Sequence, residues 1–142
     1  MTTIATTDAS SPGRNLWRSA RAVLLGLLAV FVLSLGADQL LHMLRVYPPW
    51  GVPMHDPGLN LLALSYRLAF GVVGGYVTAR FAPCHALRHA LALGAIGLAL
   101  SALGAVAAMQ AALGPAWYPV LLALSSIPTA WLGGVLYQRK RR

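Results

Sequence analysis

The amino-acid sequence predicts an all-α integral membrane protein, folded as a four-helix antiparallel bundle with both termini in the cytoplasm. The 142-residue chain contains four apolar runs close to the roughly 20 residues that a helix needs to cross a bilayer. Only 10% of its residues are charged and its mean hydropathy is +0.66, whereas a soluble domain carries about 25% charged residues. Its basic residues also gather beside the ends of the runs.

The four runs divide the chain into one transmembrane domain and two tails. Residues 1–13 are small and polar, which predicts a disordered cytoplasmic tail. The first run has a basic start and could also be a cleaved signal peptide, but it stays apolar through Leu44, which is long enough to span. We expect a transmembrane domain over residues 14–138, a basic cytoplasmic tail over 139–142, and helices at about 20–44, 60–82, 87–113 and 116–138.

The distribution of basic residues predicts the orientation. Nine of the eleven Lys and Arg residues flank the two termini and the turn between the second and third runs: Arg14, Arg18, Arg21, Arg80, Arg88, Arg139, Lys140, Arg141 and Arg142. By the positive-inside rule, these segments lie in the cytoplasm of a multi-pass protein of the bacterial inner membrane. The net charge of +8 does not indicate nucleic-acid binding, because the charges lie between and beside apolar runs. The bilayer is the expected partner.

The connections predict an up-and-down arrangement. The segment 46–60 contains four prolines and should be an extended, turn-rich loop on the outer surface. The other two turns are short, so consecutive helices should be antiparallel. Pro128 lies inside the fourth run and should bend that helix, with the hydroxyls of Ser125 and Ser126 available to the freed carbonyls.

A polar cluster is predicted near the outer end of the first two helices. Asp38 and Arg67 lie at similar estimated depths on antiparallel neighbours, so an ion pair is geometrically available and would offset the cost of burying either charge alone. His42 and Arg45 follow Asp38 at i+4 and i+7 and share its helix face. Gln39 and Tyr66 lie beside them. The cluster is either an interhelical clamp or a proton or substrate site.

Small residues predict close helix packing. The residues concerned are Gly71, Gly75, Gly97, Ser101, Gly133 and Gly134. They suit packing within one chain, and a homodimer seam is the alternative. The pattern Gly71-x-x-Gly74-Gly75 also resembles Ala130-x-x-Gly133-Gly134. This echo indicates either a duplicated hairpin, with an axis along the membrane normal, or convergence on small residues.

Other chemistry has little support in the sequence. Cys84, His85 and His89 supply at most three ligands, so we expect no metal site, and the single cysteine excludes an intrachain disulfide. The glycine motif lies inside a spanning helix, so it is no phosphate loop. An enzyme would need His42, His55 and Asp56 to converge above the membrane. We therefore expect neither a cofactor nor enzymatic activity.

Three segments carry a resemblance to a known group. Gly74-Gly75-Tyr-Val-Thr-Ala-Arg80-Phe-Ala-Pro83, His85-Ala-Leu-Arg88-His-Ala-Leu-Ala-Leu-Gly94 and Gly114-Pro115-Ala-Trp117-Tyr118-Pro119 resemble uncharacterised small four-helix inner-membrane proteins of proteobacteria. The resemblance covers the last three helices and implies architecture and compartment. Small multidrug transporters are of similar size, but this chain has no Glu in its first helix.

Two functions remain open at this point. The first is a structural or accessory membrane component, alone, as a homodimer or within a larger membrane complex. The second is a small proton-coupled transporter that uses Asp38 as its proton carrier. The two differ in whether Asp38 faces a water-filled cavity or is sealed against Arg67.

Overall fold

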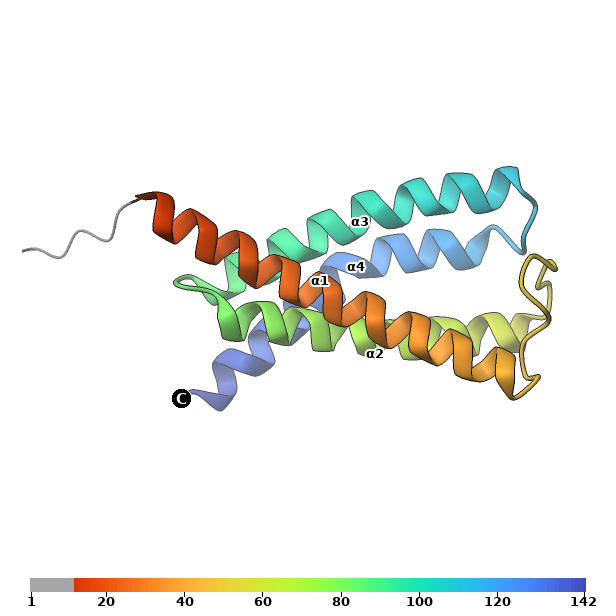
Figure 1. The fold of residues 1–142 in the computed structure, drawn as a ribbon, viewed down its shortest axis with the longest axis horizontal. Coiled ribbons are helices and arrows are strands. Elements are labelled where there is room, and N and C mark those ends of the chain that lie inside the picture. The colour runs from red at the N-terminus through yellow and green to blue at the C-terminus, as the bar shows by residue number, and fades with distance from the viewer. Residues whose placement is uncertain (1–11) are drawn as a thin grey trace, which may run out of the picture.

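The computed structural model describes residues 12–142, and the described chain forms four helices without a strand. The helices are α1 (Pro12–Met43), α2 (Pro57–Phe81), α3 (Ala86–Gln110) and α4 (Trp117–Lys140). Each is long and apolar enough to cross a membrane. Successive helices run in opposite directions (Figure 1). The all-α fold with four candidate spans is therefore confirmed, while the tail predicted over residues 1–13 falls mostly outside the described residues.

The first helix begins earlier than the sequence analysis placed it. It starts at Pro12 rather than near residue 20, so residues 12 and 13 are helical and not part of a tail. Proline is favoured in the first turn of a helix, where its missing N–H costs nothing. The 32 residues of α1 span about 48 Å at 1.5 Å per residue, which exceeds the roughly 30 Å of a bilayer core. The early turns carrying Arg14 and Arg18 can therefore lie in the headgroup region.

The loop between α1 and α2 is tied down where it leads into α2. Asp56 caps α2 by accepting a hydrogen bond from the Leu59 N–H at 3.0 Å, and Pro57 opens the helix. The buried side chain of Asn60 donates to the carbonyls of Met54 and Asp56. The Met54 N–H donates to the carbonyl of Leu113, in the turn between α3 and α4. The proline-rich segment is thus pinned across the outer end of the bundle.

Adjacent glycines direct each helix toward different neighbours. Gly74 of α2 lies against Val30 and Gly26 of α1, whereas Gly75 lies against the backbone of Ala130 in α4. In α4 the residue that meets α2 is Gly133, which approaches the backbone of Val72. Gly134, the next residue, lies against Ala90 and Leu87 of α3. Consecutive residues of a helix point about 100° apart, so the two glycines of each pair face two different neighbouring helices.

The order of the two helix contacts along each glycine pair determines where α1 and α3 lie. Both α2 and α4 run from the outer loops toward Arg80 and Arg139. In α2 the first glycine of the pair, Gly74, faces the hairpin partner α1, and the second, Gly75, faces α4. In α4 the first glycine, Gly133, faces α2, and the second, Gly134, faces the hairpin partner α3. The two hairpins are therefore arranged as near mirror images, with α1 and α3 on the same side of the α2–α4 pair. This is not the two-fold relation that a duplicated hairpin about the membrane normal would have, so convergence explains the echo better.

Contacts between the helices agree with this cross-section. α3 packs on α4, α4 packs on α2 and α2 packs on α1. α3 also contacts α2 and, to a smaller extent, α1, and no part of α1 packs directly on α4. Among the predicted packing residues, Gly71 lies against the Thr129 side chain, Gly75 and Gly133 lie against backbone atoms, and Gly134 lies against the Ala90 and Leu87 side chains. Gly97 makes no such close approach. A methyl group at Gly97 would meet only Ser126 at 3.5 Å, an ordinary contact, and both residues line a cavity between the helices.

The fourth helix bends in its middle, where Pro128 lies (Figure 1). The hydroxyl of Thr129 donates to the Ser125 and Ser126 carbonyls, and Ser125 and Ser126 donate to the Leu122 carbonyl. The serine hydroxyls therefore do not take the Leu124 carbonyl that Pro128 leaves without its helical donor, contrary to the sequence expectation. The bend itself is confirmed.

The α2–α4 seam generates a stability prediction. We expect Gly75→Ala to destabilise the protein by about 1–3 kcal/mol, because the added methyl group would overlap the backbone of Ala130. Thermal unfolding in detergent measures the effect. Gly104→Ala is the matched control, because no atom lies within 4 Å of a methyl group there, and alanine is intrinsically the better helix former. Equal effects at the two positions would mean that the seam is not closely packed.

Candidate functional site

The centre of the candidate site is the ion pair between α1 and α2. A guanidinium nitrogen of Arg67 lies 2.5 Å from one carboxylate oxygen of Asp38. The Asp38 side chain is 9% exposed and that of Arg67 is 29% exposed. The structure therefore contains the ion pair expected from the sequence, and it is the only one among residues 12–142. Removing either partner would leave the other charge buried without compensation.

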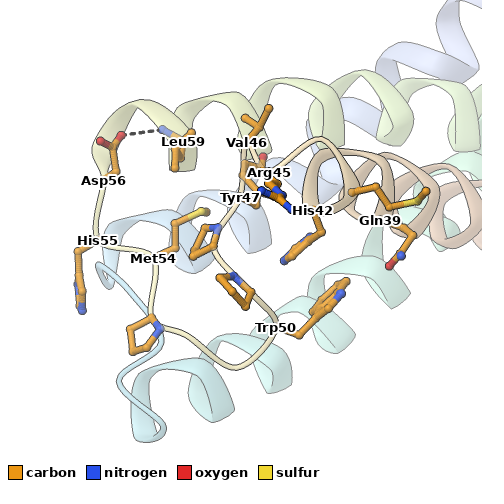
Figure 2. A pocket seen from close by; sticks show the side chains of 14 residues that line it. Gln39, His42, Arg45, Val46, Tyr47, Trp50, Met54, His55, Asp56 and Leu59 are labelled. Atoms are coloured by element: carbon orange, nitrogen blue, oxygen red, sulfur yellow. Dashed lines mark hydrogen bonds between the residues drawn. The ribbon is translucent and has the colours of Figure 1, made fainter.

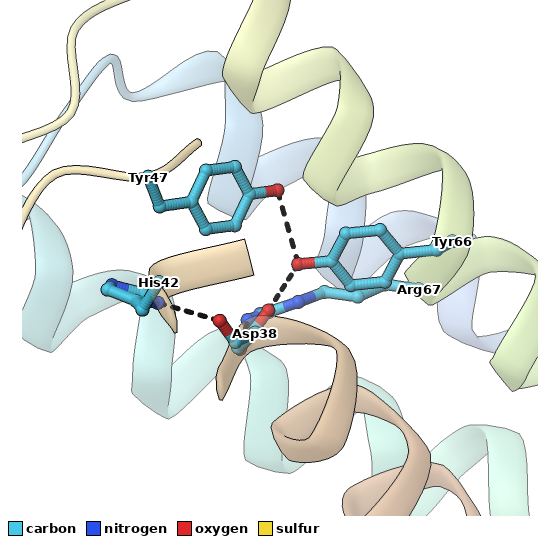
Figure 3. Close-up of polar contacts among 5 residues, drawn as sticks. All are labelled: Asp38, His42, Tyr47, Tyr66 and Arg67. Atoms are coloured by element: carbon cyan, nitrogen blue, oxygen red, sulfur yellow. Dashed lines mark hydrogen bonds and ion pairs between the residues drawn. The ribbon is translucent and has the colours of Figure 1, made fainter. Parts of the chain in front are cut away.

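Two tyrosines complete the surroundings of the carboxylate. The Tyr66 hydroxyl donates its proton to the second oxygen of Asp38. Because that proton is used, Tyr66 must accept from the hydroxyl of Tyr47, which lies 3.2 Å away. Figure 3 shows this chain of hydroxyls ending on Asp38. Both oxygens of the carboxylate therefore have a donor. Burial raises the pKa of Tyr47, which keeps this hydroxyl protonated at neutral pH.

The end of α1 explains how Tyr47 reaches Tyr66. The helix stops at Met43, and the N–H groups of Val46 and Tyr47 both donate to the Leu41 carbonyl. Arg45 adopts a left-handed backbone conformation with φ of 58°, which reverses the chain. Tyr47 is thereby folded back toward the bundle and is only 6% exposed. Arg45 itself is exposed and outside the helix, so it does not share the face of Asp38 as expected.

His42 takes part through the backbone and an aromatic stack. Its Nδ1 lies 2.7 Å from the carbonyl oxygen of Asp38, one helical turn earlier, and must be the donor because a carbonyl only accepts. The ring stacks on Trp50 at 4.0 Å with an interplanar angle of 4°, and its edge relation to Tyr47 spans 5.5 Å. His42 therefore braces the outer loop against α1 without contacting the carboxylate. We call Asp38, His42, Tyr47, Tyr66 and Arg67 the Asp38 cluster.

A larger cup lies above the cluster on the outer face. Its volume is about 810 Å³, and it is lined by the loop and the end of α1, with Gln39, His42, Trp50 and Met54 among its walls (Figure 2). His55 points away from His42, and the Asp56 carboxylate is engaged in capping α2. The three groups that an enzyme reading required do not converge. Nor does any group of three or more His, Cys, Asp and Glu residues within the described chain suit a metal ion.

A second cavity reaches the ion pair from inside the bundle. It has a volume of about 210 Å³ and lies between α1 and α3, with walls from all four helices. Its lining is mainly apolar, and its polar part comes from the ion pair and from hydroxyl side chains: Asp38, Arg67, Ser34, Ser101, Ser125, Ser126 and Thr129. The Arg67 Nε is buried and has no hydrogen-bond partner among the described residues. Arg67 thus retains one unused donor beside a cavity that its carboxylate partner also lines.

The sequence identified part of this site. It predicted the meeting of Asp38 and Arg67 and the nearby positions of His42 and Tyr66. Gln39 is exposed and belongs to the cup rather than to the cluster. The sequence analysis missed the roles of Tyr47 and Trp50. Their place beside a predicted intramembrane charge was the available signal.

Known proteins offer no further assignment. No protein-family model, curated protein or solved structure matches the chain. What supports a function is the geometry of the Asp38 cluster and of the four helices that position it.

Proposed function

We propose that this protein is a structural or accessory component of the bacterial inner membrane, without enzymatic activity, and that the Asp38 cluster is its interhelical clamp. The observation that carries this proposal is the full engagement of the Asp38 carboxylate. One oxygen accepts from Arg67 and the other from Tyr66, and the side chain is only 9% exposed. A proton carrier needs a path to water, and these contacts close the outer approach.

The energetics favour the same role. A single Asp or Arg at the centre of a spanning helix costs about 2.5–3.5 kcal/mol on insertion scales, and less near the interface. Pairing removes most of this cost while joining α1 to α2, and the two tyrosines extend the connection to the outer loop. The cluster therefore stabilises the helix packing at the end of the bundle that the pinned loop covers.

The orientation with both termini in the cytoplasm rests on charge. Nine of the eleven basic residues flank one end of the helices, and the two acids of the described chain, Asp38 and Asp56, lie toward the other. Basic segments are retained on the cytoplasmic side during insertion. The turn carrying Cys84 belongs to the basic end, and its thiol is exposed.

The single cysteine makes this orientation directly testable. We expect a membrane-impermeant maleimide to label Cys84 only after the inner membrane is permeabilised. As a control, Cys84→Ser combined with Val52→Cys moves the thiol to an exposed position in the loop between α1 and α2, where labelling of spheroplasts should need no permeabilisation. Labelling of Cys84 in intact spheroplasts would contradict the orientation.

A proton-coupled transporter is the second candidate, favoured by one observation. The 210 Å³ cavity is lined by both Asp38 and Arg67, and the Arg67 Nε has no partner in the described chain. In this alternative, protonation of Asp38 would release Arg67 toward an anionic group within the cavity. The apolar character of the lining and the closed carboxylate favour the clamp.

Proton flux into liposomes separates the two candidates. For the clamp we expect proteoliposomes, under an imposed pH gradient, to show the same dye response with the wild-type protein as with Asp38→Asn, at equal amounts of folded protein. Asp56→Asn is the matched control, because Asn caps a helix as well as Asp does. A flux that is lost in Asp38→Asn but kept in Asp56→Asn would establish the transporter instead.

A further inference from the structure

A pocket lined by basic and aromatic residues lies at the opposite end of the α2–α4 seam from the Asp38 cluster. Its volume is about 370 Å³, and its lining residues are Tyr76, Arg80, Tyr137, Lys140 and Arg141. The first two belong to the last turns of α2, and the others lie at the end of α4. We call these five residues the basic pocket. Neither the clamp nor the transporter reading uses them.

Close packing of the two helices assembles the basic pocket. Gly75 and Gly133 bring the backbones of α2 and α4 together just before the pocket begins. The rings of Tyr76 and Tyr137 then meet edge to face, with centroids 5.6 Å apart and an interplanar angle of 86°. The guanidinium carbon of Arg141 lies 5.6 Å from the centroid of the Tyr137 ring, within cation–π range. The aromatic pair thus forms a partly buried wall beside three exposed cations.

The charge of the basic pocket is not balanced by the described chain. Arg80, Lys140 and Arg141 converge there, and no carboxylate lines the pocket. Within residues 12–142 the one ion pair is Arg67–Asp38 at the far end of the bundle, and the remaining acid, Asp56, caps α2 at that same end. Three cations with two tyrosines beside them are suited to bind an anion with several oxygens, because Arg, Lys and Tyr can all donate to phosphate.

Position selects the source of that anion. The basic pocket lies where two apolar, membrane-length helices end, which is the level of the lipid phosphates. Basic pockets between spanning helices are suited to anionic lipid headgroups. An exposed apolar side chain continues from it toward the membrane interior. Leu136 precedes Lys140 by four residues, so it lies on the same face of α4 as that pocket residue.

We propose that the basic pocket binds the phosphate headgroup of an anionic phospholipid, with an acyl chain lying along Leu136 of α4. The proposal rests on the membrane placement proposed above, but on neither the clamp nor the orientation. The bound lipid would join the end of α4 to α2 through its phosphate and so hold the inner end of the bundle, as the Asp38 cluster holds the outer end.

Native mass spectrometry of the delipidated full chain in detergent tests this site. The probes are phosphatidylglycerol, phosphatidylcholine with the same acyl chains, and soluble glycerol phosphate. We expect the wild-type protein to bind phosphatidylglycerol at least about tenfold more tightly than phosphatidylcholine. Substituting Arg80→Gln, Lys140→Gln and Arg141→Gln together should remove most of this preference, since each cation near the phosphate contributes to the affinity.

The matched control removes the same charge from the same end of the protein. Arg88→Gln, Arg139→Gln and Arg142→Gln change three exposed basic residues that do not line the pocket, and this variant should keep the preference. If both triple variants lose it equally, the attraction is diffuse and the proposal fails. It also fails if glycerol phosphate competes as well as phosphatidylglycerol, which would indicate a soluble phosphate site, or if the wild-type protein does not distinguish the two lipids.

Two further measurements test whether a loss of lipid binding is caused by misfolding of the variant. Thermal unfolding in lipid-free detergent should be the same for both triple variants, since the substituted side chains are exposed. If the pocket variant does not fold, Lys140→Gln alone should still weaken phosphatidylglycerol binding severalfold while Arg139→Gln does not, and equal binding by these two variants would overturn the proposal. Because binding in detergent is independent of orientation, labelling of Cys84 on the unexpected side would leave this result unchanged.

Discussion

The architecture depends on neutralising one carboxylate inside a spanning helix. Asp38 can be kept within α1 only if charge and hydrogen bonds are supplied from elsewhere in the chain. Arg67 supplies the charge and Tyr66 the hydrogen bond, and both come from α2. Tyr47 then donates a hydrogen bond to the Tyr66 hydroxyl, and Tyr47 is in place only because the chain reverses at Arg45. The buried acid thus joins α1 to α2 and, through Tyr66 and Tyr47, to the loop between them.

The glycines determine the rest of the cross-section. The two pairs, Gly74-Gly75 and Gly133-Gly134, direct α1 and α3 to the same side of the α2–α4 pair. That arrangement places a cavity between α1 and α3 and brings the inner ends of α2 and α4 together. The cavity beside Asp38 and the basic pocket are therefore consequences of one packing solution. The end with the Asp38 cluster is held by charges within the chain, whereas the end with the basic pocket carries positive charge that the described residues do not balance.

Much of this fold could be predicted from the sequence, because membrane spans follow from length and apolarity alone. The ion pair could also be predicted, since Asp38 and Arg67 carry opposite charges at similar depths in antiparallel predicted spans, where an unpaired charge is costly. The start of α1 at Pro12 could not, because Arg, Asn and Ser are compatible with either a tail or an amphipathic helix turn. The side of the α2–α4 pair on which α3 lies depends on which glycine of the Gly133-Gly134 pair faces α2 and which faces α3. Composition does not reveal this one-residue difference, because it matters only through the contacts between helices.

The site was predicted less completely, for a related reason. Tyr47 and Trp50 lie in a proline-rich loop whose path is set by the backbone reversal at Arg45 and by the hydrogen bond from Met54 to Leu113. Neither contact follows from a periodic pattern. The same holds for Asn60, whose buried amide holds the loop by two carbonyls. Periodicity predicts helices well, but it does not predict where a loop returns to the surface of the bundle.

The most direct test of the clamp is a double-mutant cycle on the ion pair, measured by thermal unfolding of purified protein in detergent. Asp38→Asn and Arg67→Gln each leave one buried charge unpaired, so each should destabilise the protein, whereas the double variant leaves none. The account predicts that the double variant loses less stability than the sum of the single losses, with a coupling of at least about 1 kcal/mol. Additive losses would show that Asp38 and Arg67 do not stabilise the bundle as a pair, and would contradict the account.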